Sequence, residues 1–300
     1  MGITFLGSYK YIKSMKNLLI VFLFITCTLS AISAQEIPVV APADSAKIST
    51  DTLKISADTV KTSVDTLKIS PEKAKISKNF IKFNITSALI KNYSLQYERV
   101  LSRGISVALS FRVMPETTIP YSDKIIKWFD VTDPETQVVI KNSIIGNYAI
   151  TPEIRFYTGK KKYGNGFYFS LFYRYGHYTA NNVLIPYDTD RGEQVTLNTS
   201  GNVSAHTGGF MIGAQWALGK HICLDWWILG PQFGVSKGDM LSLSSGTLDP
   251  IDQQDIADSI NNVDSPMFNK TVNVTADQVS MVFDGPWAGL RAGLSLGVKF

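Results

Sequence analysis

Hydrophobic and polar residues alternate without interruption over the last thirteen positions of the chain, from Ala288 to Phe300. The even-numbered positions hold alanine, leucine, valine or phenylalanine, and the odd-numbered positions hold glycine, serine, arginine or lysine. Because successive side chains of a strand point to opposite faces, this pattern predicts a β-strand with one apolar face. A strand that crosses a membrane needs roughly 9–11 residues, whereas soluble strands average about 5–6, so the length favours a transmembrane strand.

The same period-two alternation recurs from residue 80 onward and predicts seven further strands. Pro152 and the Gly230-Pro231 pair interrupt two of them and predict β-bulges, because proline cannot donate a hydrogen bond to a partner strand. The expected strands are Phe80–Ile90, Tyr93–Leu101, Ile105–Met114, Gly146–Thr158, Phe167–Tyr178, His206–Leu218, His221–Val235 and Ala288–Phe300.

After the first connection, the segments that join these strands alternate between short and long. Outer-membrane barrels have short periplasmic turns and long extracellular loops, whereas a soluble β-sandwich has no need for this regularity. The pattern therefore predicts an all-β fold, an eight-stranded antiparallel transmembrane β-barrel of the outer membrane, over residues 79–300. The short turns are expected at 102–104, 159–166 and 219–220, and the long connections at 115–145, 179–205 and 236–287.

Two segments precede the predicted barrel. Residues 1–34 combine a basic start, a short apolar run and small residues at the end, which is typical of a secretory signal peptide. Residues 35–78 form a low-complexity linker of seven-residue repeats without aromatics, which predicts a solvated periplasmic tether. Cleavage after residue 34 would leave Cys223 as the one cysteine and exclude an internal disulfide.

Charged residues fall on the polar face of several predicted strands. In a barrel this face points into the lumen, and eight strands leave room there for side chains and little else. Isolated charges at such a depth would be costly, so we predict a lumen ion-pair network that makes the barrel a poor pore for solutes. Its members are Lys82, Glu98, Arg112, Glu153, Arg155, Arg174, Asp225, Arg291 and Lys299.

Composition excludes one class of partner and otherwise agrees with this reading. An aromatic content of 11%, a charged content of 18% and 22 glycines favour β structure. The net charge is +4, and Lys10, Lys13 and Lys16 supply three of these charges within the first 34 residues. The rest of the chain is therefore close to neutral, and we expect no nucleic-acid partner.

The segment from Ile81 to Arg112, which contains Ser94-Leu-Gln-Tyr-Glu-Arg99, and the segment from Tyr148 to Gly159 resemble outer-membrane barrels of Bacteroidetes. Those barrels are classed only as domains of unknown function. The resemblance covers residues 80 to 180 and the last strand. It implies a multi-pass β-barrel in the outer membrane of a Gram-negative cell, and it implies no activity or catalytic residue.

Asp-Ser/Thr-apolar triplets in the linker resemble the O-glycosylation sequon of secreted Bacteroidetes proteins. The resemblance implies glycans on Ser45, Thr52, Thr59 and Thr66. A repeat-expanded linker without glycans is the alternative.

We expect a structural or interaction role: envelope integrity, adhesion or docking of a partner through the long connections 115–145, 179–205 and 236–287. The expected partners are outer-membrane lipid or lipopolysaccharide, a surface or periplasmic protein, and the barrel-assembly machinery, which would read Phe300 as a C-terminal insertion signal. We expect no enzyme activity, cofactor or bound metal. Aspartates of the segment 236–287 indicate a solvated acidic surface, with a calcium site as the alternative.

Two alternative functions remain open. The first is a narrow gated channel. The second is a lipid A-modifying enzyme, because outer-membrane lipid A deacylases use a histidine and a serine on a β-barrel. Its candidate residues are His177 near Thr179, or Ser204 near His206.

Overall fold

The computed structural model describes residues 78–159, 163–262 and 268–300. The predicted signal peptide, the linker up to residue 77 and the four candidate glycosylation sites lie outside these residues.

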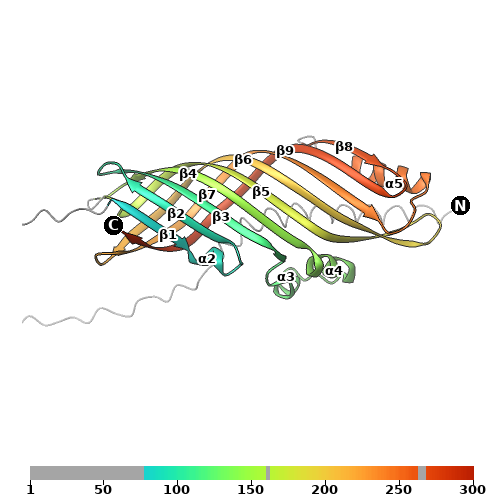
Figure 1. Cartoon of the computed structure of the whole chain (residues 1–300), viewed down its shortest axis with the longest axis horizontal. Helices are drawn as coiled ribbons and strands as arrows, with labels where there is room; N and C mark the ends of the chain where they lie inside the picture. Colours follow the sequence, from blue (N-terminus) through green and yellow to red (C-terminus); the bar gives the residue numbers. More distant parts are fainter. Residues whose placement is uncertain (1–77, 160–162, 263–267) are drawn as a thin grey trace, which may run out of the picture. The chain divides into compact units, whose positions relative to one another are not determined.

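Antiparallel strands form a ring in which each strand pairs with the next along the chain (Figure 1). The last strand pairs with the first, with Phe83 opposite Leu296. An all-β fold of antiparallel strands is therefore confirmed. The ring contains β1 (Asn79–Asn84), β2 (Tyr93–Val100), β3 (Ile105–Thr118), β4 (Ile144–Tyr157), β5 (Gly166–Asp188), β6 (Gln194–Leu218), β7 (Ile222–Ser244) and β9 (Gln278–Lys299).

A ninth strand and four helices lie in the connections. β8 (Asn269–Val274) pairs with β9 only, so it extends the sheet without entering the ring. No described helix is long and apolar enough to cross a membrane. The helices are α2 (Ile85–Ala88), α3 (Ser122–Trp128), α4 (Pro134–Asn142) and α5 (Pro250–Asn261).

The first predicted strand, Phe80–Ile90, is wrong in its second half. β1 ends at Asn84, whose side-chain oxygen accepts a hydrogen bond from the backbone N–H of Ser87 at 2.9 Å. This contact caps the N-terminus of α2, a role for which asparagine is well suited. The connection between β1 and β2 therefore contains a helical turn.

The predicted long connection 179–205 is also wrong. β5 continues to Asp188 and β6 begins at Gln194, so residues 189–193 form a short hairpin turn. Much of 236–287 is strand as well, since β7 runs to Ser244 and β9 begins at Gln278. The segment 115–145 is mainly a connection and holds α3 and α4, and a long connection also remains between β7 and β9, at 245–277, which holds α5 and β8.

Of the two predicted bulges, one is found. The pairing of β7 with both neighbours shifts register between Trp227 and Gly230, close to the predicted position. Pro152 lies in an unshifted register opposite Leu109, so the bulge predicted there is wrong.

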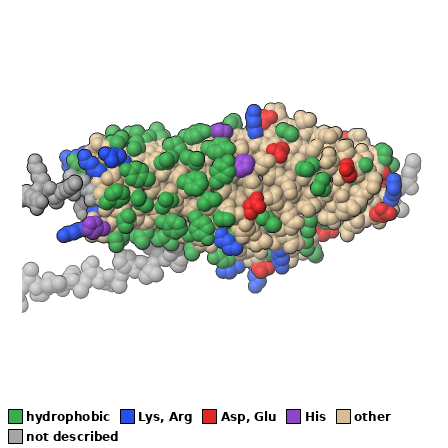
Figure 2. Space-filling view, viewed as in Figure 1, with side chains coloured by type: hydrophobic (Ala, Val, Ile, Leu, Met, Phe, Trp, Pro, Cys, Tyr) green, Lys and Arg blue, Asp and Glu red, His purple; other side chains and the backbone are tan. Residues whose placement is uncertain are grey.

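The half of the ring near the C-terminus carries its hydrophobic side chains on the outside (Figure 2). Leu171 is 59% exposed and Phe169 is 54% exposed, while the interior neighbour Ser170 is buried. We call this exterior band the belt. It comprises Ile81, Phe83, Leu95, Tyr97, Leu109, Phe111, Ile150, Ile154, Phe156, Phe167, Phe169, Leu171, Tyr173, Phe210, Trp216, Trp226, Leu296 and Val298.

The other half of the ring has the opposite polarity, because here the hydrophobic side chains are buried. On β6, for example, Val195 and Leu197 are buried while Asn198 is exposed. We call this half, with α3, α4, α5 and β8, the cap. Its core comprises Met114, Ile119, Val139, Ile140, Ile145, Ala180, Val183, Ile185, Val195, Leu197, Leu248, Ile256, Ile260, Val279 and Met281.

The N-terminus of α5 ties the cap together. Asp249 caps the helix, and its carboxylate accepts from the N–H groups of Ile251 and Asp252. Asp252 is buried and accepts from the backbone N–H of Asp190, at 2.8 Å, in the turn between β5 and β6. The expectation that this aspartate belongs to a solvated acidic surface is therefore wrong, because it fixes the helix to the hairpin.

One edge of β9 has two different strand partners. Residues 295–299 pair with β1, and residues 279–284 pair with β8. Along 285–294, no strand of the described chain pairs with this edge. Helix α2 lies beside it, where the N–H of Leu294 donates to the Thr86 hydroxyl at 3.1 Å.

Candidate functional site: the buried polar interior

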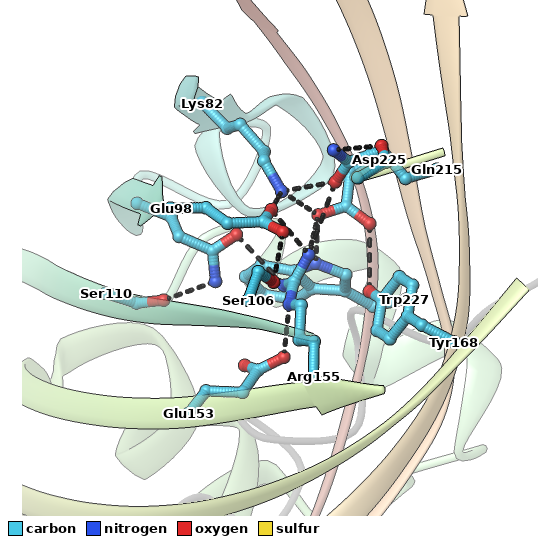
Figure 3. A network of polar contacts seen from close by, with 12 residues as sticks. Lys82, Glu98, Ser106, Ser110, Glu153, Arg155, Tyr168, Gln215, Asp225 and Trp227 are labelled. Carbon is cyan, nitrogen blue, oxygen red and sulfur yellow. Dashed lines mark hydrogen bonds and ion pairs between the residues drawn. The ribbon is translucent and has the colours of Figure 1, made fainter. Parts of the chain in front are cut away.

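Polar and apolar residues alternate along each strand, so the polar side chains point into the part of the ring that the belt surrounds. Lys82, Glu98, Arg155 and Asp225 come from β1, β2, β4 and β7, and Figure 3 shows them converging on one point. Each of these side chains is completely buried. Charges without solvent are tolerated only when they are paired and hydrogen-bonded, so the arrangement depends on its partners.

Asp225 is the central acceptor of this network. Its carboxylate accepts from the Lys82 ammonium and from the Arg155 guanidinium, both at 2.7 Å. The Tyr168 hydroxyl donates to its other oxygen at 2.8 Å, and the Trp227 indole N–H donates at 3.2 Å. The carboxylate of Asp225 therefore links β1, β4 and β5 to its own strand, β7.

Glu98 is a second acceptor beside it. Its carboxylate is paired with the Lys82 ammonium and accepts from the Tyr157 hydroxyl at 2.6 Å. Arg155 lies 3.2 Å from Glu98 and donates to Glu153 at 2.7 Å through Nε. We call the ionised group Lys82, Glu98, Glu153, Arg155 and Asp225 the ion network.

Uncharged residues complete the hydrogen bonding of the ion network. Gln96 accepts from Arg155 at 3.0 Å and donates to Ser110 at 2.9 Å, while Gln215 accepts from Lys82. These residues, together with Tyr157, Tyr168 and Trp227, were not among the members predicted for the lumen ion-pair network. The sequence signal for these residues was that each occupies a polar position in the alternation of its strand. A tyrosine or tryptophan at such a buried position needs a hydrogen-bond partner.

Three arginines lie inside the ring apart from the ion network. Arg291 stacks against the rings of Phe172 and Trp227, with its Cζ 4.3 Å and 4.9 Å from their centroids, and lies 3.5 Å from Glu153. Arg112 and Arg174 are buried as well, and Nε of Arg174 has no hydrogen-bond partner in the described chain. We call Arg112, Arg174 and Arg291 the arginine group.

The remaining predicted member of the network, Lys299, is placed differently. It lies at the end of β9, is partly exposed, and forms no ion pair with the described residues. Phe300 follows it, with its backbone hydrogen-bonded to Asn79. The structure therefore brings the other predicted members inside the ring and leaves Lys299 at its rim.

The histidines and serines considered for catalysis lie on the outer face of the ring. The structure brings His177 and Ser204 together, with Nδ1 and Oγ 2.9 Å apart, as opposed residues of β5 and β6. His206 is instead hydrogen-bonded to the Tyr173 hydroxyl at 2.6 Å. Neither pair proposed from sequence proximity forms a hydrogen bond. Residues two apart share one face of a strand but are separated by roughly 6.5–7 Å, and each histidine is paired with a side chain of the neighbouring strand instead.

No group of three histidine, cysteine or carboxylate side chains in the described ranges is arranged to hold a metal ion. The aspartates of α5 are therefore not brought together as ligands: Asp249 caps the helix and Asp252 holds the hairpin.

Comparison of the sequence with curated proteins yields no match. A family model described as "Protein of unknown function (DUF3575)" matches residues 62–231. The match spans more than half of the chain, including β1 to β6 and the first part of β7. The chain belongs to this DUF3575 family.

Proposed function

We propose that the protein is an outer-membrane β-barrel that anchors the cap at the cell surface, where the cap has a structural or partner-docking role. The observation that carries this proposal is the reversal of hydrophobic polarity along the ring. Soluble monomers rarely expose large contiguous apolar patches, whereas outer-membrane barrels carry an apolar band outside and polar residues inside.

The arrangement of connections supports an orientation in this membrane. The short connections that follow β2, β4 and β6 join strands at the same end as Asn79 and Phe300 (Figure 1). The helices lie in connections toward the other end, where the turn 189–193 is the short exception among the described residues. In outer-membrane barrels the short turns are periplasmic. The cap would then face the outside of the cell, and an exported chain agrees with the predicted signal peptide.

The ion network supports a sealed interior and weighs against the channel alternative. Asp225 and Arg155 join side chains from β1, β4, β5 and β7 across the space that solutes would need. The aromatic rings of Tyr157, Tyr168 and Trp227 fill the same level. An eight-stranded ring leaves room for little more than such side chains.

The cap supports the docking role. It has its own hydrophobic core, which the helices α4 and α5 help to cover, so it can be stable in water. Exposed apolar residues remain on its surface, among them Trp128 on α3 and Ile251 on α5. Aromatic residues at such positions are typical of protein interfaces and of membrane interfaces.

Cell fractionation tests the proposal. The native protein should sediment with outer membranes, and its gel migration should change on heating, as a folded barrel does. Protease added to intact cells should cleave the cap and leave the belt region protected. Recovery in the soluble periplasmic fraction would contradict the proposal, and single-channel currents in planar bilayers would contradict the sealed interior.

A second candidate function, lipid modification, is favoured by the hydrogen bond between His177 and Ser204. A serine activated by a histidine is a common nucleophilic arrangement, and this pair lies on the outer face next to Tyr148, whose ring centroid is 5.2 Å from that of His177. Against it, no carboxylate of the described chain forms an ion pair or a hydrogen bond with His177 to orient the ring.

Mass spectrometry of lipid A decides between the two functions. Cells that express the wild-type protein and cells that express Ser204→Ala should yield the same lipid A if the role is structural. A loss of acyl chains that requires Ser204 would establish the enzyme instead. Ser200→Ala, a similar exchange on the same face of β6, is the matched control.

A further inference from the structure

The interior of the ring holds more positive than negative charge. Among the described residues inside it, five buried cations accompany three buried anions. Two positive charges are therefore left without a counter-charge from the protein. The effective cost of an unpaired buried ion is several kcal/mol, so the excess requires a compensating group. The cations are Lys82, Arg112, Arg155, Arg174 and Arg291, and the anions are Glu98, Glu153 and Asp225.

The excess lies on the arginine group. Lys82 and Arg155 are satisfied within the ion network, where three carboxylates surround them. Arg112, by contrast, faces other cations: it lies opposite Ala149 of β4, which lies opposite Gly176 of β5, two residues from Arg174. The like charges of Arg174 and Arg291 act on it by repulsion. Apart from Glu153, which already accepts from Arg155, no carboxylate of the described chain forms an ion pair with them.

Unused hydrogen-bond donors point to the same place. Nε of Arg174 and both Nε and Nη1 of Arg291 are buried without a hydrogen-bond partner. The Arg291 Nη1 lies 3.5 Å from Glu153 Oε2, close enough for an ion pair, yet neither atom forms a hydrogen bond. A buried donor without a partner costs about 1–3 kcal/mol, and more when it is charged.

We propose that Arg112, Arg174 and Arg291 form a binding site for a phosphate-type oxyanion. The guanidinium group presents its donors as a rigid planar fork, which matches the oxygens of phosphate in two parallel hydrogen bonds. Such an anion would supply up to two negative charges and would accept from the unused nitrogens. The site is independent of the cap's partner, so it goes beyond the proposed function.

Two sources of phosphate fit this position. The first is a free phosphate ion. A lipid phosphate could instead approach from the side, because Arg291 lies on the stretch 285–294 of β9, where no described strand covers the edge and α2 lies alongside. The chemistry at the guanidinium groups is the same in both cases.

Phosphate binding to the purified full-length protein tests the site. Radiolabelled inorganic phosphate is dialysed against the protein in a zwitterionic detergent that lacks phosphate, at constant ionic strength. Arg174→Gln and Arg112→Gln should each weaken binding at least about tenfold, because each loses a charge-assisted hydrogen bond. Arg103→Gln, the same exchange at an exposed turn residue, should bind like wild type.

A second experiment distinguishes a free phosphate ion from a lipid phosphate, and a lysine variant covers the case in which a glutamine variant does not fold. The protein is reconstituted in phosphatidylcholine vesicles with and without phosphatidylglycerol, and the phosphatidylglycerol that remains with it is quantified after extraction. Retention that depends on Arg174, without binding of free phosphate, identifies the lipid headgroup. Arg174→Lys keeps the charge and serves if the glutamine variant does not fold; it should weaken binding because the fork is lost.

Binding in neither arm would overturn the proposal, as would equal binding by wild type and all arginine variants. Because the dialysis arm does not require a membrane, its outcome is separate from the fractionation test of the proposed function.

Discussion

Replacing Asp225 with alanine removes the acceptor at which several strands of the interior meet. The carboxylate binds Lys82 and Arg155 at 2.7 Å each, and it accepts from Tyr168 and Trp227. The substitution leaves a cavity at a position that is completely buried. It also leaves Lys82 and Arg155 with Glu98 as their one shared carboxylate.

The expected loss is large compared with the stability of the protein. Breaking a buried ion pair by removing one partner costs about 3–5 kcal/mol, because the remaining charge is left uncompensated. Folded domains are stable by about 5–15 kcal/mol, so the variant should lose a substantial part of its free energy of unfolding. The double variant Lys82→Met/Asp225→Leu should lose less stability than the sum of the losses of its two single variants, by about 1–3 kcal/mol.

Denaturant unfolding in detergent micelles measures these differences. Cys223 is buried, with no exposed area, so the reaction of its thiol with a maleimide reports unfolding. Asp123→Ala is the control: its pair with Lys141 spans 3.2 Å, but both side chains are exposed, and such pairs contribute about 0–1 kcal/mol. A loss below about 1 kcal/mol for Asp225→Ala, equal to the control, would refute the role of the network.

Further predictions concern the belt, the cap and the buried thiol. Leu171→Arg places a charge on the outer face and should reduce insertion into vesicles and cost about 2–4 kcal/mol, whereas Ser170→Ala on the inner face should insert normally; equal insertion would mean that the faces are misassigned. Hydrogen bonds from the backbone N–H groups of Asp252 and Ile251 lower the pKa of the Asp249 carboxyl. The stability that the Asp249 carboxylate contributes is therefore present above the unfolded pKa of about 3.9 and is lost as the pH falls through the lower folded value. Hydrogen-exchange protection factors of α5 should fall below that pH, and the Asp249→Ala variant should lack this pH dependence. Native Cys223 should resist maleimide, and rapid labelling without denaturant would contradict its burial.

Alternation predicted the belt strands because outward-facing and interior positions differ sharply there. On β3, Leu109 and Phe111 are exposed while Ser110 is buried, and the predicted strand begins at the correct residue. The prediction failed where the polarity reverses. On β5 the predicted strand ended at Tyr178. The structure has a bulge just beyond this residue, where Asn182 adopts a positive φ of 56° and the register shifts between Ala180 and Val183. Beyond this bulge the hydrophobic residues are those that face inward, a change of phase that we interpreted as a loop.

The alternation in the sequence identified the members of the ion network as interior residues, but it did not show which of them form pairs. Lys82 and Asp225 are 143 residues apart, and they meet only because the ring brings β1 and β7 to either side of β9. The surplus of cations, in contrast, was already visible in the sequence, since six basic and three acidic residues were assigned to the interior. Asp252 was assigned to a solvated acidic surface because its role depends on the backbone of Asp190, which the cap places beside it.

Solvent accessibility along one strand and its neighbour tests the membrane assignment most directly. Single cysteines are introduced at Leu171 in the belt and at Asn198 in the cap, in a Cys223→Ser background, and are spin-labelled after reconstitution in vesicles. We predict that the label at position 171 is relaxed by oxygen, which dissolves in lipid, and is shielded from a water-soluble nickel complex. The label at position 198 should show the reverse. Access of the nickel complex to both positions would contradict a belt embedded in the membrane.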